Sequence, residues 1–280
     1  MSSGLTAAFR IVADAAVYRL RKREGANLVT SMTLAVALSL PVSDIAYRCL
    51  FGVLLNLFVY LLNDCFDVRL DLAAPGRDTE RTQFLSEHIG AGWAMVAALA
   101  VALGVIGWHH STGLLVAFVA NAALITAYSR VLKRWPVVDL VAMIGWGVTM
   151  ALVGFPIDSL DGWRFAGLLA ILCAVTEAIQ VIRDADSDQR AGLRTTAVVL
   201  GVDATAWVAR ALIVGACVYA GLVLNTFLGV LFLVALLVPL RAANAARSWD
   251  WFRLVLGPTW LLLLAAYRFG GSWTSWLQLG

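Results

Sequence analysis

The chain has 280 residues, of which 61% are hydrophobic and only 14% are charged, and its formal net charge is +3. A soluble domain of this length needs much more polar surface, so the composition excludes an ordinary soluble protein. Nothing in the sequence indicates nucleic-acid binding, and the small positive charge is accounted for by membrane topology below.

Nine apolar stretches follow one another along the chain, each near the length that a helix needs to cross a bilayer. They lie at about residues 26–43, 45–62, 90–108, 111–128, 136–155, 164–182, 203–221, 223–240 and 252–269. The stretches are continuously apolar and do not alternate at every second position, which favours helices over a β-barrel. The sequence therefore predicts an all-α polytopic membrane protein with about nine transmembrane helices in one bundle.

The distribution of Lys and Arg predicts the orientation. If the nine spans alternate in direction, all but four of the 21 Lys and Arg residues lie on the side of the N-terminus. The exceptions are Arg48, Arg164, Arg210 and Arg268. By the positive-inside rule, this side is cytoplasmic. We expect an integral membrane protein, in the plasma or inner membrane of a bacterial source, whose N-terminus and active-site loops are cytoplasmic.

The chain is predicted to form one membrane domain, residues 26–270. Residues 1–25 form a cytoplasmic N-terminal segment in this interpretation, and residues 271–280 form a non-cytoplasmic tail. Residues 5–23 are compatible with an interfacial amphipathic helix, although their basic end is interpreted first as a topology anchor.

Two acidic clusters lie about 120 residues apart and hold six of the 18 acidic residues. Asp64, Asp67 and Asp71 have the spacing i, i+3, i+7, which puts them on one face of a helix. Asp184 and Asp188 are four residues apart and also share a face. Crowded carboxylates repel one another, so we expect a cation between the two helix ends. Mg²⁺ carrying a diphosphate is the natural candidate, because it binds through few carboxylates together with phosphate oxygens and water.

Polar loops of membrane proteins often carry acids without function. Two clusters at helical spacing, on one side of the membrane and both flanked by Arg, favour a functional site. Asn56 and Asn63 precede the first cluster on the same span and predict that its last turns face a polar cavity.

Basic residues near the clusters are candidates for binding a diphosphate. Lys133, one of only two lysines, stands beside Arg134 in the connection that begins at Tyr128. Cations at this place would neutralise charge on a departing diphosphate. Further arginines follow both clusters, although each on its own is also explained as a charge that sets topology.

These motifs resemble those of the UbiA superfamily of intramembrane prenyltransferases. Asn63, Asp64, Asp67 and Asp71 match its N-D-x-x-D-x-x-x-D pattern, and the residues from Asp184 to Asp188 match its D-x-x-x-D pattern. The segments 128–134 and 192–197 resemble its Y-[ST]-x-x-[LF]-K-R and G-x-x-[ST]-[TL] segments. The resemblance covers about residues 15–270.

The resemblance implies a helical bundle around a central cavity, with cytoplasmic cap loops over a prenyl diphosphate. It implies Mg²⁺ ligands at Asn63, Asp64, Asp67, Asp71, Asp184 and Asp188. It implies catalytic roles for Tyr128, Lys133 and Arg134. It implies diphosphate contacts from Asn56, Arg77, Arg81, Lys133 and Arg194. The implied reaction transfers a prenyl group, through a carbocation shielded from water, to a small-molecule acceptor that is expected to be aromatic, and the tail leaves toward lipid.

Some features leave the acceptor open. Many members of the superfamily have an Arg-Pro pair after the first cluster, whereas here Arg81 precedes Thr82. This departure argues against a close match to the ubiquinone- or menaquinone-type enzymes. Some members of the superfamily resemble terpene cyclases, and a membrane terpene cyclase with the same metal site and no external acceptor is the alternative. A transporter is a third possibility, but it predicts acids near the middle of the bilayer rather than at span ends. The single continuous motif of a CDP-alcohol phosphotransferase is not found.

Three further positions carry expectations of their own. Glu177 and Gln180 are predicted to line the cavity wall. Asp139 is predicted to hold Lys133 or Arg134, or to line the acceptor cavity.

Overall fold

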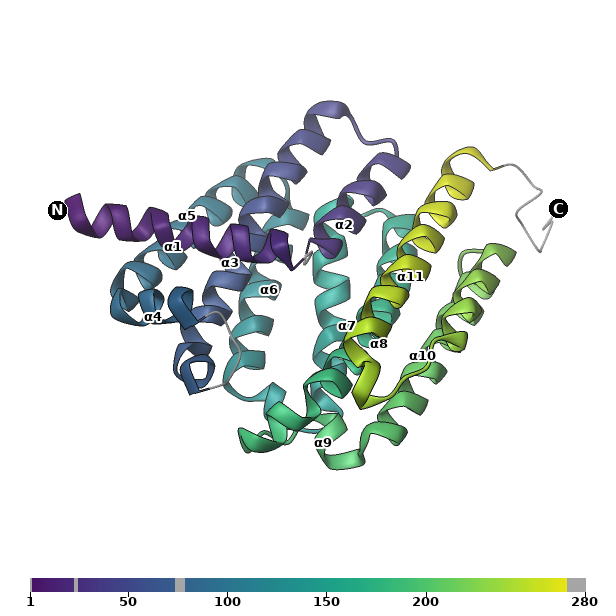
Figure 1. Ribbon diagram of the computed structural model, residues 1–280. Coiled ribbons are helices and arrows are strands. Elements are labelled where there is room, and N and C mark those ends of the chain that lie inside the picture. The colour runs from purple at the N-terminus through teal and green to yellow at the C-terminus, as the bar shows by residue number, and fades with distance from the viewer. Residues whose placement is uncertain (1, 23–24, 74–78, 271–280) are drawn as a thin grey trace.

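The computed structural model describes residues 2–22, 25–73 and 79–270, and every regular element in these ranges is helical (Figure 1). The elements, with η for 3-10 helices, are α1 (Ser2–Arg21), α2 (Ala26–Ala37), α3 (Val42–Ala73), α4 (Thr79–Glu87), α5 (Ile89–His110), α6 (Thr112–Arg130), η1 (Leu132–Arg134), α7 (Val138–Ala151), η2 (Leu152–Gly154), α8 (Leu160–Arg190), α9 (Thr196–Leu200), α10 (Val202–Leu222), η3 (Phe227–Leu237), η4 (Ala242–Asn244) and α11 (Ala245–Phe269). The prediction of an all-α fold is confirmed.

Six of the described helices are long and apolar enough to cross a bilayer, namely α3, α5, α6, α8, α10 and α11. Three shorter apolar segments lie within the remaining predicted stretches: α2, α7 with η2, and η3. These lengths and compositions indicate an integral membrane protein but do not give the number of spans, so nine transmembrane helices remain a prediction.

Two of the long helices continue well past their apolar stretches. α3 extends to Ala73 and α8 extends to Arg190, so both acidic clusters lie on the final turns of membrane helices. Apolar composition marks the part of a helix suited to the bilayer, whereas the backbone hydrogen bonding of the helix continues into polar sequence. The clusters are therefore held on rigid helices.

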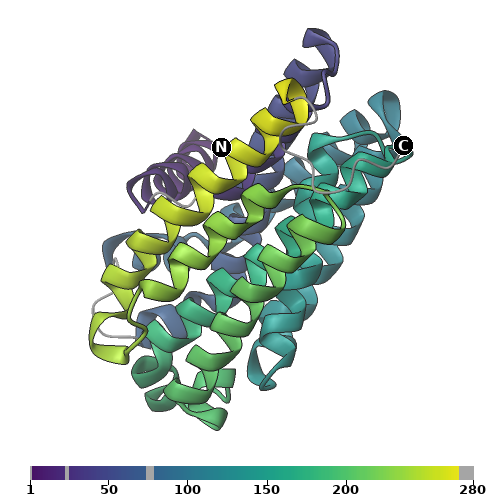
Figure 2. The same ribbon diagram turned by 90° about the vertical axis from the view of Figure 1, so that its right-hand side faces the viewer.

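Helix α8 lies in the interior of the bundle. Its most apolar window is 78% buried within the protein, compared with 22–44% for the other five long helices, which expose more of their apolar surface. α8 packs against α7, α10 and α11, and the long helices run side by side (Figure 2).

The contact between α7 and α8 depends on a glycine. A Cβ atom added at Gly147 would lie 2.6 Å from the Cα of Ala170 and 2.8 Å from the carbonyl oxygen of Leu169. Both are backbone atoms, so no side chain is able to move aside. Gly147 therefore allows the two helix backbones to approach closely, as small residues do between membrane helices.

Helix α1 lies across the long helices rather than along them (Figure 1) and packs against α3, α4 and α5. Ala7, Ile11 and Ala15 recur at intervals of four and are all at most 4% exposed. This apolar stripe fixes which face of α1 meets the bundle. Its location at a membrane interface stays a prediction.

A buried arginine stabilises the end of the bundle opposite the acidic clusters. Arg48 is 2% exposed, and its Nη1 donates to the carbonyl oxygens of Val153 and Phe155 at 3.0 Å each. Its Nε donates to Asp44. Arg48 was one of the four exceptions to the charge asymmetry, and these partners give it a structural role.

We predict that Gly147→Ala lowers the free energy of unfolding by about 1–3 kcal/mol, because an added methyl group overpacks a contact between two backbones. Thermal unfolding of the purified protein in detergent measures this. Gly145→Ala on the same helix is the matched control, because its Cβ would meet only side-chain atoms of Leu124, at 3.4 Å or more. Equal melting temperatures for the two variants would contradict the assignment.

Candidate active site

Two connected chambers lie inside the bundle. The inner chamber has a volume of about 690 Å³, and the outer chamber has a volume of about 1100 Å³. They share the lining residues Arg19, Arg21, Lys22, Asn63, Tyr128, Glu177, Gln180, Arg183 and Ala246. A molecule with a charged head and an apolar tail is therefore able to occupy both chambers at once.

The outer chamber contains acids from both predicted clusters together with several basic side chains. The predicted site residues that line it are Asn63, Asp67, Arg81, Tyr128, Lys133, Asp184 and Asp188. The structure thus brings residues of α3, α4, α6, η1 and α8 to one cavity. Gln180 and Glu177 also line it, in agreement with their predicted place on the cavity wall.

The cavity-facing residues of the first cluster have fixed partners. The Nζ of Lys133 forms a salt bridge with Oδ1 of Asp67. The hydroxyl of Ser129 donates to Oδ1 of Asn63 at 2.9 Å. Asn63 and Asp67 are one turn apart on α3 and so share the face that meets η1 and the end of α6.

Asp64 points away from the two chambers. It is 3% exposed and lines neither chamber, and it faces a small space between α1, α3 and α4. Its Oδ1 accepts from Nη2 of Arg19 at 2.7 Å, and its Oδ2 accepts from Nη1 of Arg81 at 2.6 Å. Two guanidinium groups therefore compensate one buried carboxylate, as a buried charge requires.

Aromatic rings hold these two guanidinium groups in place. The Cζ of Arg19 lies 4.2 Å from the ring centroid of Tyr60, and the Cζ of Arg81 lies 4.3 Å from that of Tyr18. Both distances are within the range of cation–π attraction.

The second cluster lies on the last turns of α8. Asp184 accepts from Nε and Nη2 of Arg183, both at 2.8 Å. Asp184 and Asp188 line the outer chamber, whereas Asp186 is exposed and lines neither chamber. The i, i+4 spacing thus separates the cavity-facing acids from the solvent-facing one.

The other predicted site residues that the structure describes do not line either chamber. Asp71 is partly buried on α3, and Arg134 and Arg194 are exposed. Asn56 has a buried Nδ2 that makes no hydrogen bond within the described residues. Arg77 lies outside the described residues.

The donor chemistry of the outer chamber fits a divalent cation that carries a phosphate ligand. Among the residues that the structure describes, no three His, Cys, Asp or Glu side chains are close enough to hold a metal ion by themselves. Mg²⁺ bound to phosphates needs only one or two carboxylates and completes its octahedron with phosphate oxygens and water. Asn63, Asp67, Asp184 and Asp188 offer oxygen donors from opposite sides of one cavity, so they fit this pattern.

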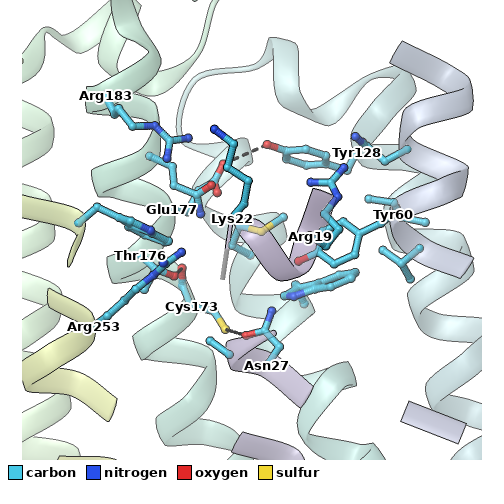
Figure 3. Close-up of a pocket in the computed structure, with 18 of the residues that line it drawn as sticks. Arg19, Lys22, Asn27, Tyr60, Tyr128, Cys173, Thr176, Glu177, Arg183 and Arg253 are labelled. Carbon is cyan, nitrogen blue, oxygen red and sulfur yellow. Dashed lines mark hydrogen bonds between the residues drawn. The ribbon is translucent and has the colours of Figure 1, made fainter. Parts of the chain in front are cut away.

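The inner chamber lies between α1, α2, α3, α6, α7, α8 and α11, and its lining combines aromatic rings with polar and charged side chains (Figure 3). Its aromatic lining residues are Tyr60, Tyr128, Trp146 and Trp249. The hydroxyl of Tyr128 donates to Oε1 of Glu177 at 3.0 Å, and the thiol of Cys173 lies 3.8 Å from Oδ1 of Asn27. Glu177 is 6% exposed, so this carboxyl group is sheltered inside the bundle.

Asp139 has a role that differs from both of its predicted ones. It is fully buried at the start of α7, accepts from the backbone N–H of Thr196 at 2.7 Å, and also accepts from the Thr196 hydroxyl. It lines neither chamber and forms no salt bridge with Lys133, which bonds to Asp67 instead. Asp139 therefore anchors the segment that follows the second cluster.

The anchored segment places Thr195 at the outer chamber. Thr195 is 5% exposed, and its hydroxyl makes no hydrogen bond within the described residues. A buried hydroxyl that lacks a partner is costly, so it is suited to donate to a ligand in this chamber.

Sequence reasoning missed Arg19 as a site residue and interpreted it only as a topology charge. The sequence did indicate a buried position, because Arg19 follows Ile11 and Ala15 at the same spacing of four residues. A charged residue on the buried stripe of an amphipathic helix needs a buried partner, and here that partner is Asp64.

The comparisons with known proteins agree with this geometry. The model of the UbiA prenyltransferase family matches residues 26–255, which is most of the chain. The chain belongs to the UbiA prenyltransferase family. The resemblance seen in the sequence motifs is thereby confirmed.

Two solved structures share the UbiA fold. Both are of a UbiA homolog from Archaeoglobus fulgidus, one bound to DMAPP and Mg²⁺ and the other to GPP and Mg²⁺. The first is 18% identical with a TM-score of 0.64 and covers 88% of this chain and 96% of that chain. The second is 15% identical with a TM-score of 0.62 and covers 94% of this chain and 98% of that chain.

One relative is similar in sequence. The C(50) beta-cyclic carotenoids biosynthesis protein LbtBC from Dietzia sp. (strain CQ4) is 31% identical over 176 residues. The match covers 58% of this chain and 40% of the relative, so this chain spans less than half of that protein's length.

We predict that Asp139→Ala lowers the free energy of unfolding by about 1–3 kcal/mol, because it leaves the buried N–H of Thr196 without an acceptor. Thermal unfolding in detergent tests this, with the exposed Asp203→Ala as the control. Unfolding of Asp139→Ala at the wild-type temperature would show that the contact with Thr196 does not stabilise the protein.

Proposed function

We propose that this UbiA family member transfers a prenyl group from an allylic prenyl diphosphate to an acceptor, with an aromatic ring as the acceptor class. The observation that carries the proposal is the continuity of the two chambers. The outer chamber is mainly polar and is lined by both acidic clusters, whereas the lining of the inner chamber is mainly apolar and includes four aromatic rings. The diphosphate would occupy the outer chamber and the prenyl chain the inner one.

In the proposed complex, the protein would bind the diphosphate mainly through electrostatic interactions. Mg²⁺, when bound, would neutralise the diphosphate and make it a better leaving group. Asn63, Asp67, Asp184 and Asp188 would hold the cation, and this assignment is supported by their shared place around one chamber. Asp64 would join them once it is released from its arginine partners.

Basic groups would bind the diphosphate oxygens directly. Lys133 and Arg81 line the outer chamber and carry charge that a phosphate is able to share. The hydroxyl of Thr195 would donate a further hydrogen bond. Donors that are held in place before the reaction stabilise the negative charge that develops on the leaving group.

The proposed reaction breaks the allylic C–O bond, and the diphosphate leaves with the bonding electron pair. The rings of Tyr60, Tyr128 and Trp146 line the inner chamber, where their faces would stabilise the allylic cation. The surrounding membrane helices would keep water away from this cation. Capture by water would otherwise yield an alcohol.

Attack by a carbon atom of the acceptor forms the new C–C bond and leaves a proton to be removed. Glu177 is the acid that lines both chambers and lies inside α8, within hydrogen-bond distance of Tyr128. We assign it the role of proton acceptor. Its bond to Tyr128 would hold the carboxylate toward the chamber.

A terpene cyclase is the second candidate. The relative from Dietzia is named for cyclic carotenoid biosynthesis, which favours chemistry in which a double bond of a polyene captures the cation. The same diphosphate end would serve this reaction without an external aromatic acceptor.

We further propose the membrane orientation that the charge asymmetry predicts. Residues 26–270 would form the membrane domain, and the N-terminus and the ends of α3 and α8 would face the cytoplasm. This orientation supplies the outer chamber with Mg²⁺ and prenyl diphosphate from the cytoplasm.

The test of the reaction class is product analysis of the purified protein with Mg²⁺. Geranyl, farnesyl and geranylgeranyl diphosphate are each supplied alone, with aromatic acceptors, and with a linear carotenoid hydrocarbon. We predict diphosphate release and a prenylated aromatic product only when an aromatic acceptor is present. A cyclic product without acceptor, or a prenylated carotenoid, would contradict the aromatic acceptor and retain the metal-dependent diphosphate site.

The test of the site compares neighbouring aspartates. Asp184→Ala should lower turnover at least about a hundredfold, because it removes a ligand of the cation on which the departure of the diphosphate depends. Asp186→Ala is the matched control, because Asp186 is exposed and lines neither chamber. Its turnover should stay within about twofold of the wild type. Equal turnover of both variants in the product assay would refute the assignment of the second cluster.

A further inference from the structure

Arg19 connects helix α1 to both the first acidic cluster and the chambers. Its guanidinium bonds to Asp64 at 2.7 Å, and its side chain is 18% exposed and lines both chambers (Figure 3). It comes from outside the segment 26–255 that the family match covers. Arg19 is therefore a contribution of the N-terminal helix of this chain.

The charges around the first cluster are unfavourable for a bare metal ion. Asp64 and Asp67 are both in contact with cations: Arg19 and Arg81 pair with the first, and Lys133 pairs with the second. A divalent cation that approaches Asp64 must displace guanidinium groups, and it adds charge to a group that is already positive. Burial strengthens this repulsion, because water screens the charges poorly there.

A diphosphate changes this balance. Its oxygens are acceptors for the displaced guanidinium groups, which favour bidentate contacts with phosphate. The cation–π contact between Arg19 and Tyr60 keeps the guanidinium at the wall shared by the two chambers, within the space that a diphosphate would enter. An exchange of partners by Arg19 thus frees Asp64 and fills a subsite at the same time.

We propose that Arg19 is a diphosphate-binding residue whose pairing with Asp64 makes metal binding depend on the diphosphate. In the absence of a diphosphate, Arg19 occupies the carboxylate and keeps the affinity for a divalent cation low. When a diphosphate binds, Arg19 moves to it, and Asp64 becomes available to the cation. This inference rests on the proposed function of the outer chamber and adds a residue of α1 to it.

The experiment measures Mn²⁺ binding to the full-length protein in detergent by electron paramagnetic resonance, with and without inorganic diphosphate. In the wild type, we predict that diphosphate strengthens Mn²⁺ binding at least about fivefold, the lower range of measured coupling between two ligands. Arg19→Met should bind Mn²⁺ alone more tightly than the wild type. It should bind diphosphate more weakly and lose most of the coupling.

Two controls separate the exchange from simpler effects. Arg69→Met removes an exposed arginine of α3 that lines neither chamber, so it tests general electrostatics. Ile11→Ala weakens the packing of α1 without changing its charge. Both should keep the wild-type coupling. Arg19→Lys retains a cation and should keep part of it, which provides a second test if Arg19→Met is unstable.

The outcomes also separate this inference from the proposed function. Unchanged coupling in Arg19→Met, or equal loss of coupling in Ile11→Ala, would overturn the exchange while the wild type still binds Mn²⁺ with diphosphate. If the wild type binds neither, or if Asp184→Ala leaves their binding unchanged, the proposed function itself fails.

Discussion

Carboxylates buried inside a helical membrane bundle need cations or hydrogen-bond donors that compensate their charge, and this constraint shapes the end of the bundle that carries the two clusters. Asp64 is satisfied by Arg19 and Arg81, and Asp67 by Lys133. These basic residues come from α1, α4 and η1, which are the short or crossing elements around α3. The elements that surround the long helices therefore supply the charge that the first cluster requires.

Because the acids have compensating partners, the bundle is able to hold a polar chamber next to a mainly apolar one. The polar outer chamber begins where α3 and α8 extend beyond their apolar stretches, and the inner chamber lies deeper, between the apolar parts of the helices. Close approach of α7 and α8 at Gly147 fixes one wall of this arrangement. A diphosphate and a prenyl chain need such opposite environments side by side.

The sequence predicted much of this arrangement because it follows from periodicity. Continuous apolar stretches predicted the helices, and the i, i+4 spacing predicted that Asp184 and Asp188 share a face. The direction of Asp64 was not predictable in this way. The spacing of the motif predicts that Asp64 lies on the same helix face as Asp67. In the structure Asp64 instead forms salt bridges with Arg19 and Arg81, which come from other helices.

Partners from distant segments account for the other differences. Asp139 was expected near Lys133 or Arg134, which are close in sequence, yet the fold brings Thr196 to it instead. No local pattern encodes a contact between residues so far apart in the chain. Arg19 is different, because its place on the apolar stripe of α1 was visible in the sequence and indicated a buried partner.

The central claim is that the two acidic clusters bind one metal–diphosphate group between α3 and α8. The most direct test is a crystal structure of the protein with Mn²⁺ and a non-hydrolysable prenyl diphosphate analogue, in which anomalous scattering locates the metal. The account predicts anomalous peaks between Asp67 of α3 and Asp184 of α8, next to the analogue's phosphates in the outer chamber. Metal peaks elsewhere, or an analogue bound with its phosphates away from both clusters, would contradict it.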